Sequence, residues 1–179
     1  MMVRGDNCKI HPTTLFFGNE IEIGNNVRID AFCVITGDVK IGNNVHIACG
    51  SYLFGQYGIE MHDFSGLSAR VTIYSASDDY SGEYMTNPCI PDAYKHVYHG
   101  RVVIGRHAII GCNATIMPSV KIGEGVAIGA YSFVKSDCRP WSIYTGVPAA
   151  IVRNRSMKLL EREIEWRQHK TSSTQPLEK

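Results

Sequence analysis

The chain has 179 residues, of which 44% are hydrophobic, and its formal net charge is +1. The near-neutral charge and the lack of a cluster of basic residues give no support for binding to nucleic acid, or for a polybasic patch that binds a membrane surface. No apolar run approaches the roughly 18 residues of a transmembrane helix, and the first residues lack a signal-peptide segment. Six scattered cysteines without a CxxC pair are typical of reduced thiols, so we expect a cytoplasmic protein with no membrane insertion.

A six-residue repeat runs from residue 23 to residue 134 with one long break. Glycine often follows the large aliphatic residue of the repeat, where it permits a tight corner. A period of six does not fit the 3.6-residue α-helix, so each repeat is predicted to be a short strand and a corner. The register of the repeat shifts by two residues after its seventh aliphatic position. The aliphatic positions are Ile23, Ile29, Ile35, Ile41, Ile47, Leu53, Ile59, Met61, Leu67, Ile73, Ile104, Ile110, Ile116, Ile122, Ile128 and Val134.

These repeats predict an all-β prism with a core of stacked aliphatic residues. Three repeats, about 18 residues, would make one coil, and coils would stack through parallel strand pairing. We therefore expect about five coils within residues 1–155. Cys33 and Cys138 fall at small inward positions and are interpreted as core filler rather than as reactive thiols.

The stretch at about 75–101 interrupts the repeat. Ile73 and Ile104 are 31 positions apart, one more than five repeats, so the stretch is predicted to be an inserted loop. It gathers carboxylates, histidines and tyrosines, and loops on rigid scaffolds are where function concentrates. Farther along, residues 156–170 predict an amphipathic α-helix laid against the prism or capping it, and residues 171–179 a polar tail.

The repeats at 21–74 and 102–135, and the ending "IGCNATIMPSVKIGEGVAIGAYSFV…PW…TGVPAAIV", resemble the hexapeptide-repeat acyltransferases. The stretch "YSASDDYSGEYMTNP" looks most like sugar acetyltransferases of surface-polysaccharide (O-antigen, lipopolysaccharide) pathways, including those that acylate nucleotide-linked 4-amino-4,6-dideoxy sugars. The resemblance implies a left-handed parallel β-helix and a homotrimer with active sites between subunits. It further implies acetyl-CoA as co-substrate, no required metal, and a nucleotide sugar or another saccharide as acceptor.

Acyl transfer from a thioester needs a base, and a histidine is the usual one. His99, in "HGRVVIG", has the offset of the catalytic histidine in the similar serine acetyltransferases ("H-P-K-I-x-x-G"). Galactoside-type enzymes take their base from a "G-H-P" at the start of the loop, where this chain reads "S-A-S-D-D". His99 is therefore the first candidate for the base and His96 the second, while His107 is interpreted as a surface or trimer-contact residue.

Two neighbouring aspartates could support such a base. A carboxylate that fixes the tautomer of a histidine makes it a better base. Asp78 or Asp79 could orient His99 while the other binds a hydroxyl or amine of the sugar. The alternative is that both belong to a solvated turn of the loop.

The resemblance also places the acyl donor. The backbone N–H of Cys112 would stabilise the oxyanion, and backbone groups near Ala130 would bind the pantetheine arm. Lys135 and Arg153 are candidate cations for its phosphates, or generic surface charges. Trp141 is either a plate near the cofactor tail or a contact of the predicted helix.

Three other functions stay open at this point. The enzyme could O-acetylate a glycan rather than N-acylate a nucleotide sugar. A zinc carbonic anhydrase-like trimer would need three histidines, and His96, His99 and His107 come nearest, although their spacing breaks the repeat. A non-catalytic β-helix scaffold would not need the charged loop.

Overall fold

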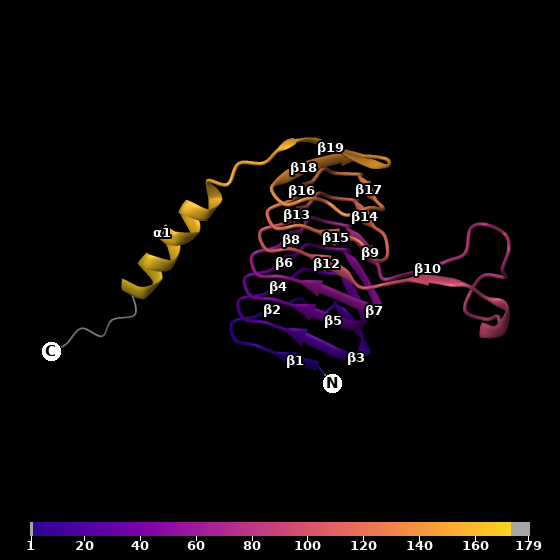
Figure 1. The fold of residues 1–179 in the computed structure, drawn as a ribbon. Coiled ribbons are helices and arrows are strands. Elements are labelled where there is room, and N and C mark those ends of the chain that lie inside the picture. The colour runs from indigo at the N-terminus through magenta and orange to yellow at the C-terminus, as the bar shows by residue number, and fades with distance from the viewer. Residues whose placement is uncertain (1, 173–179) are drawn as a thin grey trace.

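The computed structural model describes residues 2–172, which wind into a parallel β-solenoid from which one loop and one helix project (Figure 1). The all-β prediction is confirmed. Most strands are two or three residues long, because each repeat turns a corner soon after its inward residue. Within this part of the chain no helix is both long and apolar enough to cross a membrane.

Two sheets form the walls of the solenoid. The larger contains β1 (Met2–Arg4), β3 (Leu15–Ile23), β5 (Val34–Ile41), β7 (Tyr52–Met61), β9 (Thr72–Tyr74), β12 (Val102–Ile104), β14 (Thr115–Ile116), β15 (Lys121–Ile122) and β17 (Phe133–Val134). The smaller contains β2 (Lys9–Ile10), β4 (Arg28–Ile29), β6 (His46–Ile47), β8 (Gly66–Leu67), β13 (Ile109–Ile110), β16 (Ala127–Ile128), β18 (Ser142–Gly146) and β19 (Ala149–Asn154). All pairs in both sheets are parallel except the closing β18–β19 hairpin, which is antiparallel.

Inward side chains of equal repeat position stack along the axis in three ladders. Pairing registers give the ladders Phe16-Ile35-Leu53-Ile73-Ile116-Val134, Ile10-Ile29-Ile47-Leu67-Ile110-Ile128-Tyr144 and Ile23-Ile41-Met61-Ile104-Ile122-Cys138. Nearly all of these side chains are buried, and each buried aliphatic contributes roughly 1.5–3 kcal/mol. Cys33 and Cys138 are buried among them, and burial raises the pKa of both thiols, that of Cys138 to about 12.

The solenoid has about seven turns, so the expectation of about five coils was too low. The smaller sheet shows this directly, since it holds one parallel strand per turn from β2 to β18. The aliphatic repeat misses the first turn because Phe16 precedes Ile23 by seven residues, and an irregularity after Phe17 in β3 accommodates the extra one. It misses the last turn because Tyr144 takes the place of an aliphatic residue there.

The slip of the repeat after Ile59 corresponds to a bulge in β7. Residues 56–58 of β7 face the single residue Asp38 of β5. Gly58 has φ +97°, and a Cβ there would approach the Arg101 guanidinium to 3.0 Å. Bulges redirect side chains, and this one turns Tyr57 toward the inserted loop.

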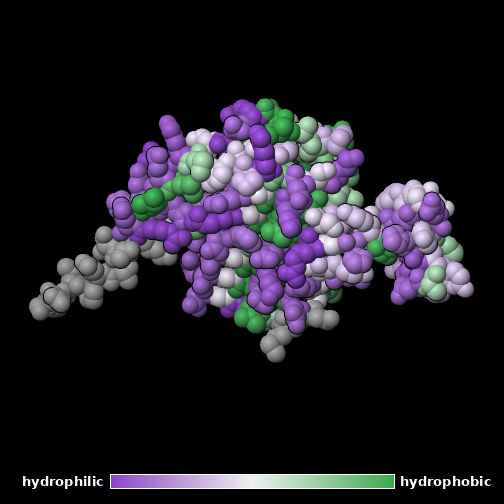
Figure 2. All heavy atoms as spheres, in the orientation of Figure 1, coloured by the Kyte–Doolittle hydropathy of each residue, from purple (hydrophilic) through white to green (hydrophobic). Residues whose placement is uncertain are grey.

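The inserted loop is an arm that stands away from the solenoid wall (Figures 1 and 2). Its stem is an antiparallel ribbon of β10 (Ala76–Asp78) and β11 (Val97–His99), and its far part includes the 3₁₀ turn η1 (Asp92–Tyr94). Residues 80–89 at the tip are all exposed. At the opposite end of the chain, α1 (Leu159–Ser172) begins three residues later than predicted, because residues 156–158 form a turn in which Ser156 Oγ accepts the Lys158 N–H.

Helix α1 contacts the solenoid differently from the amphipathic expectation. The apolar side chains of Met157, just before the helix, and of Ile164 within it are 52% and 58% exposed. The contact is made instead by Glu163, whose side chain is only 9% exposed, and by Trp166, which packs edge-on against Phe64. Beyond Ser172, the rest of the predicted tail lies outside the described residues.

Candidate active site

A cavity of about 1160 Å³ lies between the arm and the outer face of the solenoid. The arm ribbon forms one wall and the outward side chains of β9, β14 and β17 form the other. The bulge of β7 closes the inner end. The lining residues are Gln56, Tyr57, Tyr74, Ala76, Ser77, Asp78, Tyr80, Pro88, Asp92, Lys95, His96, Val97, His99, Thr115, Met117 and Phe133.

His99 ends the arm ribbon and lines this cavity. Its backbone pairs with Ala76, and its carbonyl accepts a hydrogen bond from Ser119 Oγ at 3.3 Å. Its imidazole stacks on the ring of Tyr57, with centroids 4.0 Å apart and planes within 10°. Tyr57 was not among the residues predicted from the sequence. The available signal was the two-residue slip of the repeat that places it on the bulge.

Asp78 and His96 line the same cavity. Asp78 faces Val97 across the ribbon, two residue pairs farther out than the pair of Ala76 and His99. His96 tilts against Tyr84, with ring centroids 5.3 Å apart. Among the described residues, neither side chain forms a hydrogen bond or ion pair with the imidazole of His99, so His99 has no carboxylate partner in the described part of its own subunit.

Asp79 belongs to a turn of the arm instead. Its carboxylate accepts hydrogen bonds from Ser81 Oγ at 2.8 Å and from the Gly82 N–H at 3.1 Å. The Ser81 hydroxyl is the main reason that the pKa of Asp79 lies below its usual value. The alternative that the sequence left open, a turn of the loop, therefore describes Asp79 better than a role beside His99.

One basic side chain lines the cavity besides the histidines. Lys95 follows η1, and its side chain is 12% exposed. Its Nζ lies 2.9 Å from a carboxylate oxygen of Asp92, whose side chain is 99% exposed. This pair gives the outer part of the cavity a fixed positive group that an anionic ligand could reach by displacing an exposed carboxylate.

Cys112 and Ala130 lie on successive turns of one corner of the solenoid, away from the cavity lining. The Tyr131 N–H donates to the Cys112 carbonyl at 2.9 Å, and a Cβ on Gly111 would meet the Ala130 nitrogen at 2.5 Å. Within the described residues, the Cys112 N–H has no hydrogen-bond acceptor. The corner therefore offers a backbone N–H donor. Its two successive turns pack so closely that no side chain fits between them at Gly111.

Lys135 and Arg153 are exposed, and neither forms an ion pair within residues 2–172. Arg155 is different, because its guanidinium donates to the carbonyls of His107 and Gly125 and thereby fixes the chain that leads to α1. Trp141 packs over Gly125, at a corner other than that of Cys112. The Trp141 carbonyl accepts the Arg155 N–H, beside the segment that leads to α1, and both of its predicted roles stay predictions.

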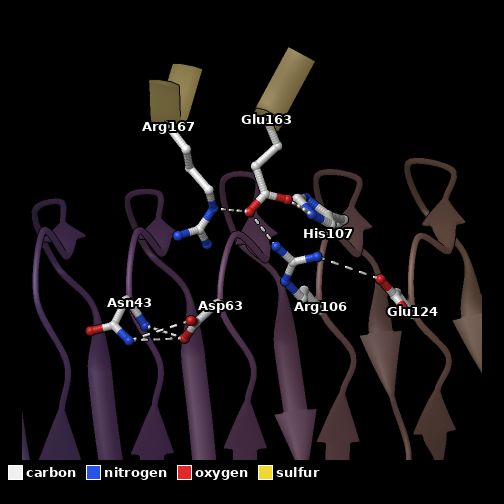
Figure 3. A network of polar contacts seen from close by, with 7 residues as sticks. All are labelled: Asn43, Asp63, Arg106, His107, Glu124, Glu163 and Arg167. Carbon is white, nitrogen blue, oxygen red and sulfur yellow. Dashed lines mark hydrogen bonds and ion pairs between the residues drawn. The ribbon is translucent and has the colours of Figure 1, made fainter. Parts of the chain in front are cut away.

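A second polar cluster joins α1 to the solenoid (Figure 3). Glu163 accepts hydrogen bonds from Arg106, from Arg167 Nε at 2.7 Å and from His107 Nε2 at 2.8 Å. His107 also stacks on Phe64, with centroids 5.1 Å apart. The His107 side chain is 9% exposed and bound to Glu163, so it contacts helix α1 and is not the surface residue that was one of its two predicted roles; the other, a trimer contact, stays a prediction.

The described residues contain no group of three His, Cys, Asp or Glu side chains placed to hold a metal ion. His96 and His99 share the cavity, but His107 is bound to Glu163 under α1. The three histidines of the zinc hypothesis are thus divided between two sites.

Comparison with known proteins agrees with this geometry. The model of the bacterial transferase hexapeptide family matches residues 20–55 and 101–136, on either side of the arm. A dTDP-4-amino-4,6-dideoxy-D-glucose acyltransferase of Escherichia coli is 45% identical over 163 residues, which span 89% of this chain and 85% of that protein.

Solved structures of AntD, an N-acyltransferase from Bacillus cereus, share the fold. A serine-to-cysteine variant in complex with dTDP-4-amino-4,6-dideoxyglucose and Coenzyme A is 42% identical, with a TM-score of 0.90 over 93% of this chain and 90% of that one. AntD with dTDP and 3-hydroxybutyryl-CoA is also 42% identical, with a TM-score of 0.90 over 95% and 91%. The chain belongs to the hexapeptide-repeat acyltransferases and is itself an acyltransferase.

Proposed function

We propose that the protein transfers an acetyl group from acetyl-CoA to the amino group of dTDP-linked 4-amino-4,6-dideoxyglucose. The observation that carries this proposal is the agreement with AntD, which holds that amino sugar and Coenzyme A on a chain superimposable over 93% of this one. The proposed place of action is the cytoplasm, and the product is a sugar donor for surface-polysaccharide (O-antigen) assembly.

The proposed reaction is a direct attack of the amine on the thioester. The nitrogen bonds to the carbonyl carbon and the C–S bond breaks. The coenzyme A thiolate leaves and is protonated, so the products are an amide and a free thiol. His99, on the cavity wall, takes the proton that the amine loses, which accounts for roughly 10²–10⁴-fold of the rate. The N–H of Cys112, unpaired among the described residues, stabilises the oxyanion, worth about 10²–10³-fold.

Asp78 and His96 complete the acceptor side of this proposal. Asp78 faces the cavity, where its carboxylate can accept a hydrogen bond from the amine or from a hydroxyl of the sugar. His96 remains the second candidate for the base. Lys95 is the proposed cation for the nucleotide diphosphate. Its present partner, the Asp92 carboxylate, is fully exposed to solvent, so the phosphates can displace it.

We further propose that the protein works as a homotrimer with each active site between two subunits. Two features support this. Residues 80–89 of the arm are exposed and extend away from their own solenoid (Figure 1). In addition, none of the proposed donor-binding residues, Cys112, Ala130, Lys135 and Arg153, lines the cavity that contains His99. A neighbouring subunit would supply its Cys112 corner to that cavity, with Lys135 and Arg153 on the coenzyme phosphates.

An acceptor panel tests the proposal. Purified protein would be given acetyl-CoA with dTDP-4-amino-4,6-dideoxyglucose, with the corresponding 4-hydroxy nucleotide sugar, or with a finished glycan, while free thiol is recorded. We expect turnover with the amino sugar alone. Turnover with only the hydroxylated sugar or the glycan would replace N-acylation by the O-acetylation alternative. A parallel series with 3-hydroxybutyryl-CoA identifies the acyl group.

A further inference from the structure

We propose that Tyr57 is a positioning residue for this reaction: it fixes the plane of the His99 imidazole through ring stacking, and Ser75 holds the two rings in register. The proposal rests on the proposed function, in which His99 is the base. It concerns a residue on the β7 bulge, 42 positions before His99 in the sequence, that approaches the arm only in the folded chain.

The ring geometry suits a base held by stacking. The two centroids are 4.0 Å apart and the planes differ by 10°, so the phenol covers one face of the imidazole. Both imidazole nitrogens lie in the ring plane, and stacking leaves that edge open. Because both residues line the cavity, the open edge can meet an acceptor there. Free rotation about the side-chain bonds of His99 would otherwise spread the nitrogens over several directions.

Ser75 joins the bulge to the hinge of the arm through two hydrogen bonds, one to the Tyr57 N–H and one to the Gly100 N–H. Ser75 is completely buried, and its Oγ accepts the Tyr57 N–H at 2.9 Å and donates to the Phe54 carbonyl at 2.8 Å. Its own carbonyl accepts the N–H of Gly100, the residue after His99, at 3.0 Å. One buried residue thus ties the bulge and the hinge of the arm to the same point of the solenoid.

The solenoid core does not account for Tyr57. Its side chain is 38% exposed, outside the three ladders, and the bulge that presents it breaks the pairing of β5 and β7. The bulge also requires a positive φ at Gly58. Such local departures from regular pairing are typical of positions beside active sites. The contact that the bulge provides is the stack on His99.

A spectroscopic experiment tests the contact itself. In the wild type, the Tyr57 ring current should shift the carbon-bound imidazole protons of His99 upfield in an NMR spectrum assigned with His99→Asn. Tyr57→Phe should keep this shift, and Tyr57→Leu should abolish it. Tyr98→Leu is the matched control, because Tyr98 adjoins His99 on β11 but lies outside the cavity lining. An unshifted wild-type signal, or one that survives Tyr57→Leu, overturns the stack.

A kinetic experiment tests the role. We expect Tyr57→Leu to lower kcat at least tenfold, with the KM values for the amino sugar and acetyl-CoA changed less than twofold. Tyr57→Phe should restore kcat. In a His99→Asn background Tyr57→Leu should have no further effect, because the two residues act as one unit. Multiplicative losses in the double variant, or a fall in affinity with kcat unchanged, would overturn the proposal.

Two controls keep these outcomes distinct. Thermal unfolding checks that Tyr57→Leu is folded, and Tyr57→Met serves as the second apolar variant if it is not. If the wild type fails to acylate the amino sugar, the proposed function fails, and the NMR experiment still decides the stack without any substrate. If the wild type is active but His99→Asn is equally active, the role of His99 as base, and with it that of Tyr57, is refuted.

Discussion

Replacing Glu163 by glutamine should release helix α1 from the solenoid without unfolding the solenoid. The Glu163 carboxylate accepts three hydrogen bonds from Arg106, Arg167 and His107, and its side chain is 9% exposed. A hydrogen bond to a charged group contributes about 1.5–3 kcal/mol. Arg106 and Arg167 are 33% and 57% exposed, so solvent screens their hydrogen bonds to Glu163. A glutamine at this position also keeps one acceptor oxygen. We therefore expect the docking free energy of α1 to weaken by about 2–3 kcal/mol, which raises the fraction of undocked helix roughly 30–150-fold.

Trp166 provides the assay, since it packs edge-on against Phe64 with centroids 5.8 Å apart when the helix is docked. Its fluorescence, together with protease cleavage at residues 155–158, would report undocking, and Glu161→Gln on the same helix is the matched control. Equal fluorescence and cleavage for Glu163→Gln and wild type would show that the Glu163 carboxylate does not hold α1 on the solenoid.

The same carboxylate predicts a pH dependence. Burial alone raises the pKa of Glu163, but the hydrogen bonds from Arg167, His107 and Arg106 outweigh it and hold the pKa below the usual value. Because the pKa is lower in the docked state, the contribution is complete above the ordinary glutamate pKa of about 4.3 and is lost as pH falls through the docked-state value. Wild-type docking should weaken in acid, while docking of Glu163→Gln should change less.

Three further outcomes follow from the fold and the site. Ile110→Ala, at a fully buried ladder position, should lower the free energy of unfolding by about 2–5 kcal/mol in urea titrations. Arg153→Ala should raise the KM for acetyl-CoA several-fold with the melting temperature unchanged, whereas Arg155→Ala should lower the melting temperature because its guanidinium donates to the part-buried carbonyls of His107 and Gly125. Asp78→Asn should lower kcat about tenfold or more, whereas Asp79→Asn should mainly speed proteolysis of the arm, whose turn it closes.

The solenoid was predictable because each inward position recurs with a fixed period and stacks on its own kind. The count of turns failed where the period slips by one before Ile23 and where Tyr144 replaces an aliphatic residue. Periodicity detects a ladder only while its spacing and residue type stay constant. An extra residue absorbed by a bulge leaves the packing intact but removes the signal.

The site was predictable only where one short segment carries it. His99, His96 and Asp78 are close in sequence and share the cavity, so the composition of the arm was sufficient to find them. Tyr57 was missed because its contact with His99 depends on a bulge in β7, one turn before the arm and 42 residues from His99. The role of His107 was missed for a similar reason, since its partner Glu163 is 56 residues distant.

The most direct test of the account is the mass of the product formed from dTDP-4-amino-4,6-dideoxyglucose and acetyl-CoA by the wild type and by His99→Asn. We expect one added acetyl group, linked as an amide that resists mild alkali and formed at least a hundredfold more slowly by the variant. An alkali-labile ester would contradict N-acylation. An amide formed at the same rate by both proteins would show that His99 is not the base.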